Sequence, residues 1–225
     1  LLLSGVAAED TGNAGDIKYI RCATCEALVS AAHSQVGEAA EASKKKRLDE
    51  SEVQSLVEKV CRHEAVKGEG GSWIRSLDMI EVDDRIELER QPRDGPCGKE
   101  CLTIGLACQK LLEEGWENEL GEGLWEGSMG VQRLRKVACS EWSSACRKPP
   151  PKVDAARPAG PAFRAFSDEE LAQGNTRMPG RMSVAALKHT MGVEASVDDE
   201  TMADADGDLG AEPGGGLEQA TGDAI

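Results

Sequence analysis

Eight cysteines constrain the fold of this chain more than any other feature. They all lie within the first 146 of its 225 residues, and each sits on or beside an apolar stripe of a predicted helix. Covalent bridges placed in this way are typical of small helical domains in an oxidising compartment. The cysteines are Cys22, Cys25, Cys61, Cys97, Cys101, Cys108, Cys139 and Cys146.

The Cys22-x-x-Cys25 motif has two other interpretations, a zinc site and a redox centre. The next cysteine, Cys61, is too far away for the usual zinc spacing. A thioredoxin-like centre requires a strand before the motif and a βαβ setting, and neither is predicted here. We therefore favour structural disulfides, and we expect no metal and no cofactor.

Helical spacing suggests two of the bridges. Cys22 and Cys25 share one face of a first helix, and Cys139 and Cys146 share one face of a fourth. If these helices are antiparallel, the pairs Cys22–Cys146 and Cys25–Cys139 form together.

The other four cysteines allow more than one pairing. Cys61 ends the second helix and Cys108 lies inside the third, so these two can join. Cys97 and Cys101 can then close a local loop, provided that Cys97 precedes the helix proper. The competing pattern exchanges Cys97 or Cys101 for Cys108 in the bridge to Cys61.

Periodicity predicts four helices and one hairpin. Apolar residues recur at helical spacing from Ile20, from about Lys99 and over about 129–146. They also recur behind a capping box, formed either by Asp49 and Glu52 or by Ser51 and Gln54. The alternation of apolar and charged residues predicts a β-hairpin at 73–81 and 85–90, with its turn at Asp83-Asp84. The expected fold is mainly α, a disulfide-stapled four-helix bundle over 17–148 with the hairpin inserted between helices two and three.

The two ends of the chain differ from this domain. Residues 1–8 are apolar and end in Val6-Ala7-Ala8, which predicts a signal-peptide remnant, and the polar residues 9–16 predict a linker. Residues 149–225 are first rich in Pro and Gly and then acidic, which predicts a disordered tail. After Lys188 there is no Lys or Arg, and ten acidic residues carry most of the net charge of −15.

The charge and hydropathy exclude several partners. A strongly negative chain is unsuited to nucleic acid or to an anionic membrane surface. No apolar run after the first residues approaches the roughly 20 residues of a membrane span. We expect a protein client or a chaperone as the partner.

Several segments occur in the order found in a known family. They are "KYIRCATCEAL", "VEKVCRHE", "WIRSLDMIEVDDRIEL", "CGKECLTIGLACQKLLEE", "ACSEWSSACRKPPP" and "RMPG". In these the chain resembles the Canopy family of saposin-like proteins of the endoplasmic reticulum, especially its plant and algal members. The resemblance covers about 17–150 well and the tail loosely.

The resemblance implies a saposin-like fold and a luminal accessory role, without naming the client. Many animal relatives end in a retention tetrapeptide, whereas this chain ends in Gly-Asp-Ala-Ile, so secretion is the alternative to the endoplasmic reticulum lumen.

The function expected from these features is protein–protein binding, as a co-chaperone or client adaptor in the secretory pathway. The hairpin would present the contact surface, with Trp73, Met79 and Ile86 as candidate partner-binding residues. The alternative is saposin-type lipid binding. No nucleophile elbow, zinc-protease motif or P-loop occurs, so we expect no catalytic residues and no enzyme.

Overall fold

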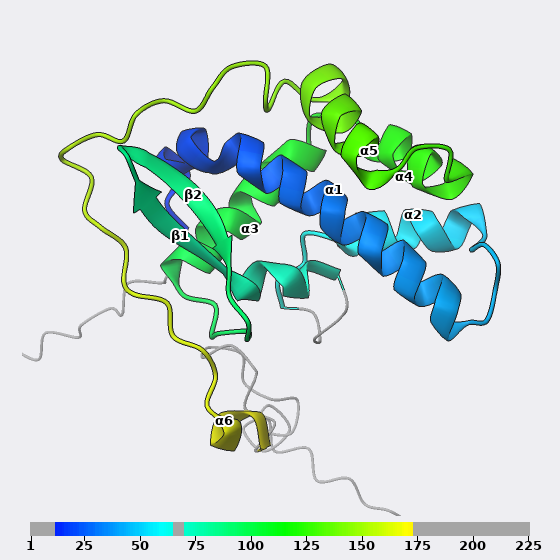
Figure 1. The fold of residues 1–225 in the computed structure, drawn as a ribbon, viewed down its shortest axis with the longest axis horizontal. Coiled ribbons are helices and arrows are strands. Elements are labelled where there is room, and N and C mark those ends of the chain that lie inside the picture. The colour runs from blue at the N-terminus through cyan, green and yellow to red at the C-terminus, as the bar shows by residue number, and fades with distance from the viewer. Residues whose placement is uncertain (1–11, 65–69, 173–225) are drawn as a thin grey trace, which may run out of the picture. The chain divides into compact units, whose positions relative to one another are not determined.

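The computed structural model describes residues 12–64 and 70–172, which form a mainly helical fold with one small sheet (Figure 1). The expected signal-peptide remnant and the acidic part of the expected tail lie outside the described residues. Part of the expected linker is helical, because Asn13 accepts a hydrogen bond from the backbone N–H of Gly15 and caps a 3-10 turn at Ala14–Asp16.

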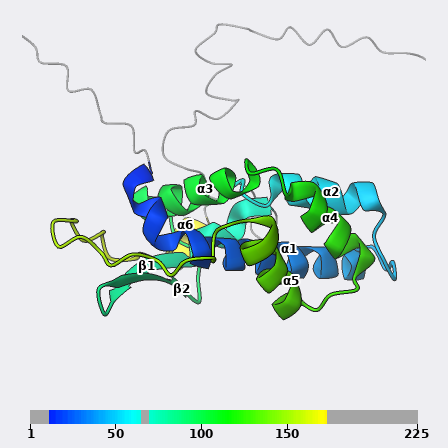
Figure 2. The same cartoon turned by 90° about the horizontal axis from the view of Figure 1, so that it is seen from above.

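The long helix α1, Ile17–Ala42, lies at the centre of the domain between the hairpin and α3, Lys99–Leu112 (Figure 2). Its inward face combines small and branched side chains, which lets both neighbours approach closely. The buried apolar residues of α1 are Ile17, Tyr19, Ile20, Cys25, Leu28, Val29, Ala31 and Ala32.

Helix α2, Glu50–Lys59, begins at the Asp49–Glu52 capping box, the first of the two that the sequence allowed. The backbone N–H of Asp49 donates to the Glu52 carboxylate at 2.8 Å, and the Asp49 side chain accepts from the backbone of Glu52 in return. The first bond pairs the Asp49 N–H ahead of the helix, and the second adds an acceptor for the Glu52 N–H, which also donates to the Asp49 carbonyl at 3.0 Å.

The predicted fourth helix is divided in the structure. Helix α5 spans Val131–Val137 and continues as a π-helical turn over Ala138–Trp142, so it ends before the expected limit. A further helix, α4, spans Glu117–Glu126 and was not expected because glycines interrupt it. Gly121 packs against the end of the Gln54 side chain of α2, and a Cβ at Gly123 would lie in tight contact with Leu134 of α5, at 3.2 Å from its Cδ1. These glycines therefore allow α4 to pack closely.

The predicted hairpin is present between α2 and α3. Strand β1, Leu77–Val82, pairs antiparallel with β2, Arg85–Arg90. The expected first strand began too early, because Trp73 belongs to a 3-10 helix at Gly70–Ser76. There the Ser76 hydroxyl donates to the carbonyl of Trp73 at 2.8 Å, which supports the helical turn.

Four disulfides stabilise the domain, three of them between segments that are distant in the sequence. The bridges are Cys22–Cys146, Cys25–Cys139, Cys61–Cys108 and Cys97–Cys101, and no cysteine is free. This is the leading pattern expected from helical spacing, and the competing exchange with Cys108 does not occur. The first two bridges tie α1 to the end of the α5 region, and the third ties the end of α2 to α3.

The segment 149–166, which we call the strap, packs on the domain where the sequence indicated a linker. Figure 1 shows it leaving the α5 region, passing the hairpin turn and descending beside β1. The N–H of Val153 donates to the Asp84 carbonyl at 2.8 Å, and the N–H of Phe166 donates to the Asp94 carbonyl at 2.9 Å. Phe166 is buried, and the short helix α6, Asp168–Ala172, follows. The folded region therefore continues beyond the expected boundary at 148.

Candidate protein-binding site

The hairpin turn is built from two aspartates in the left-handed backbone region. Asp83 has φ 48° and Asp84 has φ 60°, and the flanking residues Val82 and Arg85 pair directly. Two successive positive φ values are those of a type I′ turn, whose twist matches that of the strands. The turn therefore sets a single register for the hairpin.

The inner face of the hairpin belongs to the core, which corrects the expected contact residues. Trp73, Met79 and Ile86 are only 7%, 7% and 4% exposed. The indole N–H of Trp73 donates to the Val60 carbonyl at 2.8 Å, which ties the base of the hairpin to the end of α2. These three side chains hold the hairpin in place and do not offer a surface to a partner.

The outer face alternates with the inner one and combines apolar and charged groups. Ile80 is partly exposed and Val82 is 39% exposed. Arg85, Glu87 and Glu89 stand on the same face of the neighbouring strand, because directly paired residues share a face. An apolar patch framed by charges is a suitable surface for protein contact.

The strap is anchored to the hairpin side of α1 by a buried ion pair. The Arg157 guanidinium lies 3.0 Å from the Asp16 carboxylate, with side chains only 7% and 11% exposed, and 3.9 Å from Glu81 of β1. Next to it, the N–H of Asp154 donates to the Tyr19 hydroxyl at 3.3 Å. Removing one partner of such a pair would leave the other charge buried and uncompensated.

Glu100, at the start of α3, lies where α3, β1 and the strap meet. Its carboxylate accepts a hydrogen bond from the backbone N–H of Met79 at 3.3 Å. The strap passes directly over it at Gly160, where a Cβ would collide with the carboxylate. Burial raises the pKa of Glu100 to about 7 and neighbouring Asp78 adds to this, while the Met79 N–H and Arg157 oppose it.

The sequence assigned no role to Glu100 or Arg157. Arg157 stands in a Pro-rich stretch without periodicity, and Glu100 is one of many glutamates in the first turn of a helix. Their importance comes from neighbours that are far away in the chain, so no local pattern marks them.

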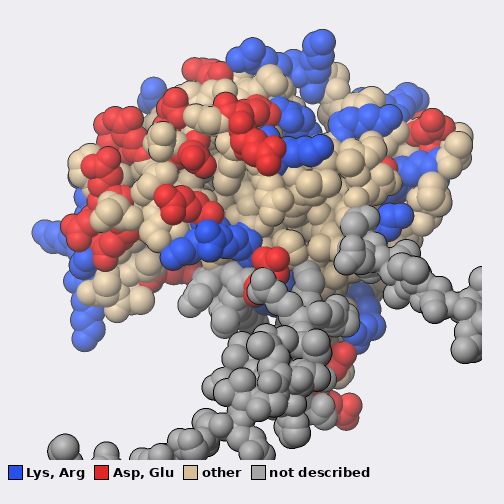
Figure 3. Space-filling model, turned by 180° about the vertical axis from the view of Figure 1, so that it is seen from behind, with Lys and Arg blue, Asp and Glu red and all other residues tan. Residues whose placement is uncertain are grey.

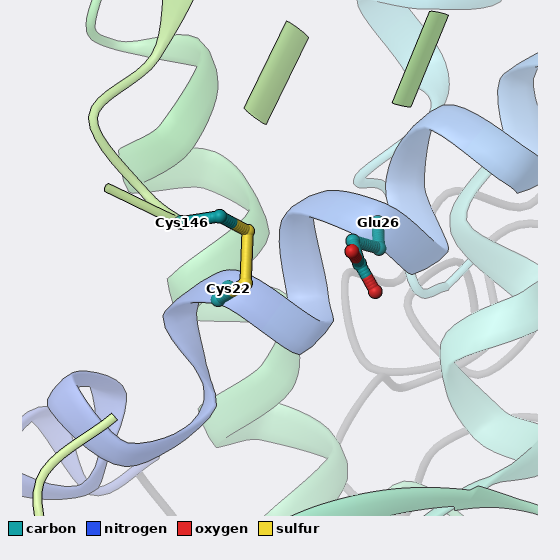
Figure 4. Close-up of side chains that lie close together, drawn as sticks. All are labelled: Cys22, Glu26 and Cys146. Carbon is teal, nitrogen blue, oxygen red and sulfur yellow. A yellow bond between two sulfur atoms is a disulfide. The ribbon is translucent and has the colours of Figure 1, made fainter. Parts of the chain in front are cut away.

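One group of residues superficially resembles a metal site. Cys22, Glu26 and Cys146 each place a potential ligand atom within 4.8 Å of the others. Figure 4 shows Cys22 and Glu26 on α1, with the Cys146 sulfur bonded to that of Cys22. A disulfide offers no thiolate for a metal, and Glu26 accepts a hydrogen bond from Arg135 at 2.8 Å. The group is a bridge beside an ion pair.

None of the described helices combines the length and the apolar composition needed to cross a bilayer. The chain matches no protein-family model, no curated protein and no solved structure. Its function must therefore be argued from the site.

Proposed function

We propose that this chain is a luminal accessory protein that binds a protein partner, as a co-chaperone or client adaptor, through the outer face of its hairpin. In this proposal it is a saposin-like protein of the Canopy type that acts in the endoplasmic reticulum lumen, with secretion as the alternative. The observation that carries the proposal is Val82, which is 39% exposed at the tip of β1 on a rigidly held hairpin.

Rigidity supports a binding role for this surface. The hairpin is held by its turn, by its buried inner face and by the strap beside β1, so its outer face is ordered before a partner arrives. Pre-organisation of this kind reduces the entropy lost on binding. A flexible loop with the same residues would bind more weakly.

The four disulfides support the proposed compartment. Bridges of this number form and persist in the secretory pathway and outside the cell, and they are rare in the cytosol. They also keep a small domain folded while it meets unfolded clients.

Lipid binding of the saposin type is less well supported. A lipid clasp needs a broad apolar face, whereas Val82 and Leu171 are the only large hydrophobic side chains exposed within the described ranges. Figure 3 shows acidic side chains concentrated over the half of the rear face that contains α2 and α4. An acidic surface of this kind repels anionic lipid. The exposed glutamates of α2 and α4 include Glu50, Glu58, Glu119 and Glu122.

The test is site-specific photo-crosslinking in the lumen. A photoreactive residue replaces Val82 in one variant and Leu171 in a matched control, since Leu171 is 43% exposed but lies in α6. We expect discrete protein adducts from position 82 that are absent from position 171. Identical adduct patterns, or no adduct from position 82, would contradict the proposal. Co-flotation of the purified protein with liposomes at acid or neutral pH would favour lipid binding instead.

A further inference from the structure

The two edges of the hairpin sheet have different surroundings. The N–H of Gln91 donates to the Ser76 carbonyl at 2.7 Å, so these two residues form a hydrogen-bonded pair across the hairpin. Because this pattern alternates, the backbone groups of Leu77, Met79 and Glu81 point away from the hairpin on β1. Those of Ile86, Leu88 and Arg90 point away from it on β2.

Contacts within the described part of the chain cover the β1 edge. Glu100 accepts the outward N–H of Met79, and the strap runs along the same side, with Arg157 beside Glu81. For β2, no hydrogen bond within residues 12–64 and 70–172 joins the outward backbone groups to another segment. An open strand edge of this kind is a template for an added strand.

A groove continues the β2 edge at its Arg90 end. It has a volume of about 440 Å³ and lies between α1 and the base of the hairpin. Ser30, Ser34 and Glu38 line it from α1, and Arg90 and Asp94 line it from the other side. An extended chain paired with β2 would therefore pass beyond Arg90 into this groove.

The charges on β2 select the occupant. Glu87 and Glu89 stand exposed on the outer face, while Ile86 and Leu88 face inward. A second copy of the chain is a poor occupant, because the two antiparallel registers with the fullest β2–β2 overlap place Glu87 opposite another Glu87 or opposite Glu89. Like charges directly opposite each other destabilise a pair, whereas Lys or Arg at these positions would stabilise it.

We propose that the open edge of β2 binds an extended segment of a partner protein as an added antiparallel strand, with basic residues opposite Glu87 and Glu89 and an apolar residue opposite Leu88. This inference rests on the proposed protein-binding function and specifies the site and the class of segment recognised. Main-chain hydrogen bonds to Ile86, Leu88 and Arg90 would provide affinity, and the charge pattern would provide selectivity.

The probe is a fluorescently labelled peptide, Thr-Lys-Val-Lys-Ile-Glu, with the charge-inverted peptide Thr-Glu-Val-Glu-Ile-Lys as its control. Binding to the oxidised full chain is measured by fluorescence polarisation. In this register the three charged peptide residues lie opposite Glu89, Glu87 and Arg85, and inversion turns three attractions into three repulsions. We therefore expect the control peptide to bind at least about tenfold more weakly. The double variant Glu87→Lys/Glu89→Lys should reverse this preference, and both positions are exposed, so the variant should fold. Equal binding of the two peptides would overturn the inference.

A second pair of variants isolates the backbone edge. Leu88→Pro removes an N–H that points out of the hairpin and leaves the internal hydrogen bonds intact, whereas Leu88→Ala keeps that N–H. We expect peptide binding to be lost in Leu88→Pro and retained within a few-fold in Leu88→Ala. Equal effects of the two substitutions would overturn the strand-addition mechanism. Dimerisation of the wild type that Leu88→Pro abolishes would also overturn it, in favour of a second copy.

The two proposals can fail separately. Specific adducts from position 82 without peptide binding would overturn this inference and leave the proposed function standing. Selective peptide binding without any luminal adduct would support the edge as a binding site and contradict the proposed function.

Discussion

The Asp16 carboxylate, just before α1, holds the Arg157 guanidinium of the strap at 3.0 Å in a buried ion pair. The pair connects the start of the domain to a segment that follows its last disulfide. Together with Glu81 of β1, 3.9 Å from Arg157, it joins α1, the hairpin and the strap at one point. It adds to the backbone hydrogen bonds that anchor the strap at Val153 and Phe166.

Replacing Arg157 should release the strap. Arg157→Ala leaves Asp16 buried without its partner, so we expect a loss of about 3 kcal/mol in the free energy of unfolding. Amide hydrogen exchange of residues 153–166 should become fast, as measured by mass spectrometry. Lys152→Ala is the matched control, because its ion pair with Asp84 is exposed at 3.1 Å and should contribute no more than about 0.5 kcal/mol. Equal protection of the strap in both variants would contradict this prediction.

Glu100 should make stability depend on pH in the neutral range. Its pKa is raised to about 7 from an ordinary value of 4.5, so between these values the folded protein keeps a proton that the unfolded chain releases. The free energy of unfolding therefore falls as pH rises through this window. Glu100→Gln keeps an acceptor for Met79 and cannot ionise. Because the side chain is only half-buried, we expect this variant to be more stable than wild type by about 1 kcal/mol at pH 8, and no more stable at pH 4.

The measurement for Glu100 is denaturant unfolding at several pH values. The exposed Glu119→Gln variant serves as the control and should follow the wild-type profile. A constant difference between Glu100→Gln and wild type across the range would show that the substitution acts through packing and not through ionisation.

The long-range disulfides should contribute more stability than the local one. Cys25 and Cys139 are separated by 114 residues, and Cys97 and Cys101 by 4. Because Cys22–Cys146, with a separation of 124 residues, stays closed in the first variant, Cys25–Cys139 closes an additional loop of only about 10 residues. In the chain-entropy model we therefore expect Cys25→Ala/Cys139→Ala to lose about 3 kcal/mol and Cys97→Ala/Cys101→Ala about 2 kcal/mol. Guanidinium unfolding of both double variants, with the remaining bridges verified by peptide mapping, tests this order. A larger loss from the local pair would contradict it.

The hairpin turn should tolerate glycine with a gain in stability. Asp84 has φ 60°, which costs energy for a residue with a Cβ and none for glycine. We expect Asp84→Gly to raise the free energy of unfolding by about 0.5 kcal/mol, as type I′ turns favour glycine at this position. Glu87→Gly, in the extended part of β2, should instead lose about 1 kcal/mol in thermal unfolding. A loss in both variants would show that the Asp84 side chain is more important than its backbone strain.

Local patterns in the sequence were sufficient for much of this domain. The spacing of Cys22 and Cys25 against Cys139 and Cys146 predicted two bridges, since residues on one helix face can reach only one face of a neighbour. The Asp49–Glu52 capping box and the Asp83-Asp84 turn depend on residues a few positions apart, so their signals are readable without the fold. The same holds for the alternation that predicted the hairpin.

The other features depend on contacts between distant segments. In the sequence, Gly121 and Gly123 indicate a broken helix, and only their packing against α2 and α5 explains why α4 forms. The strap has no hydrophobic periodicity that would distinguish it from a linker. Trp73, Met79 and Ile86 resemble interface residues in composition, and their burial follows only from the face that the hairpin turns toward α1 and α3. The raised pKa of Glu100 and the Asp16–Arg157 pair have the same origin, because burial and electrostatics depend on which groups lie close in space.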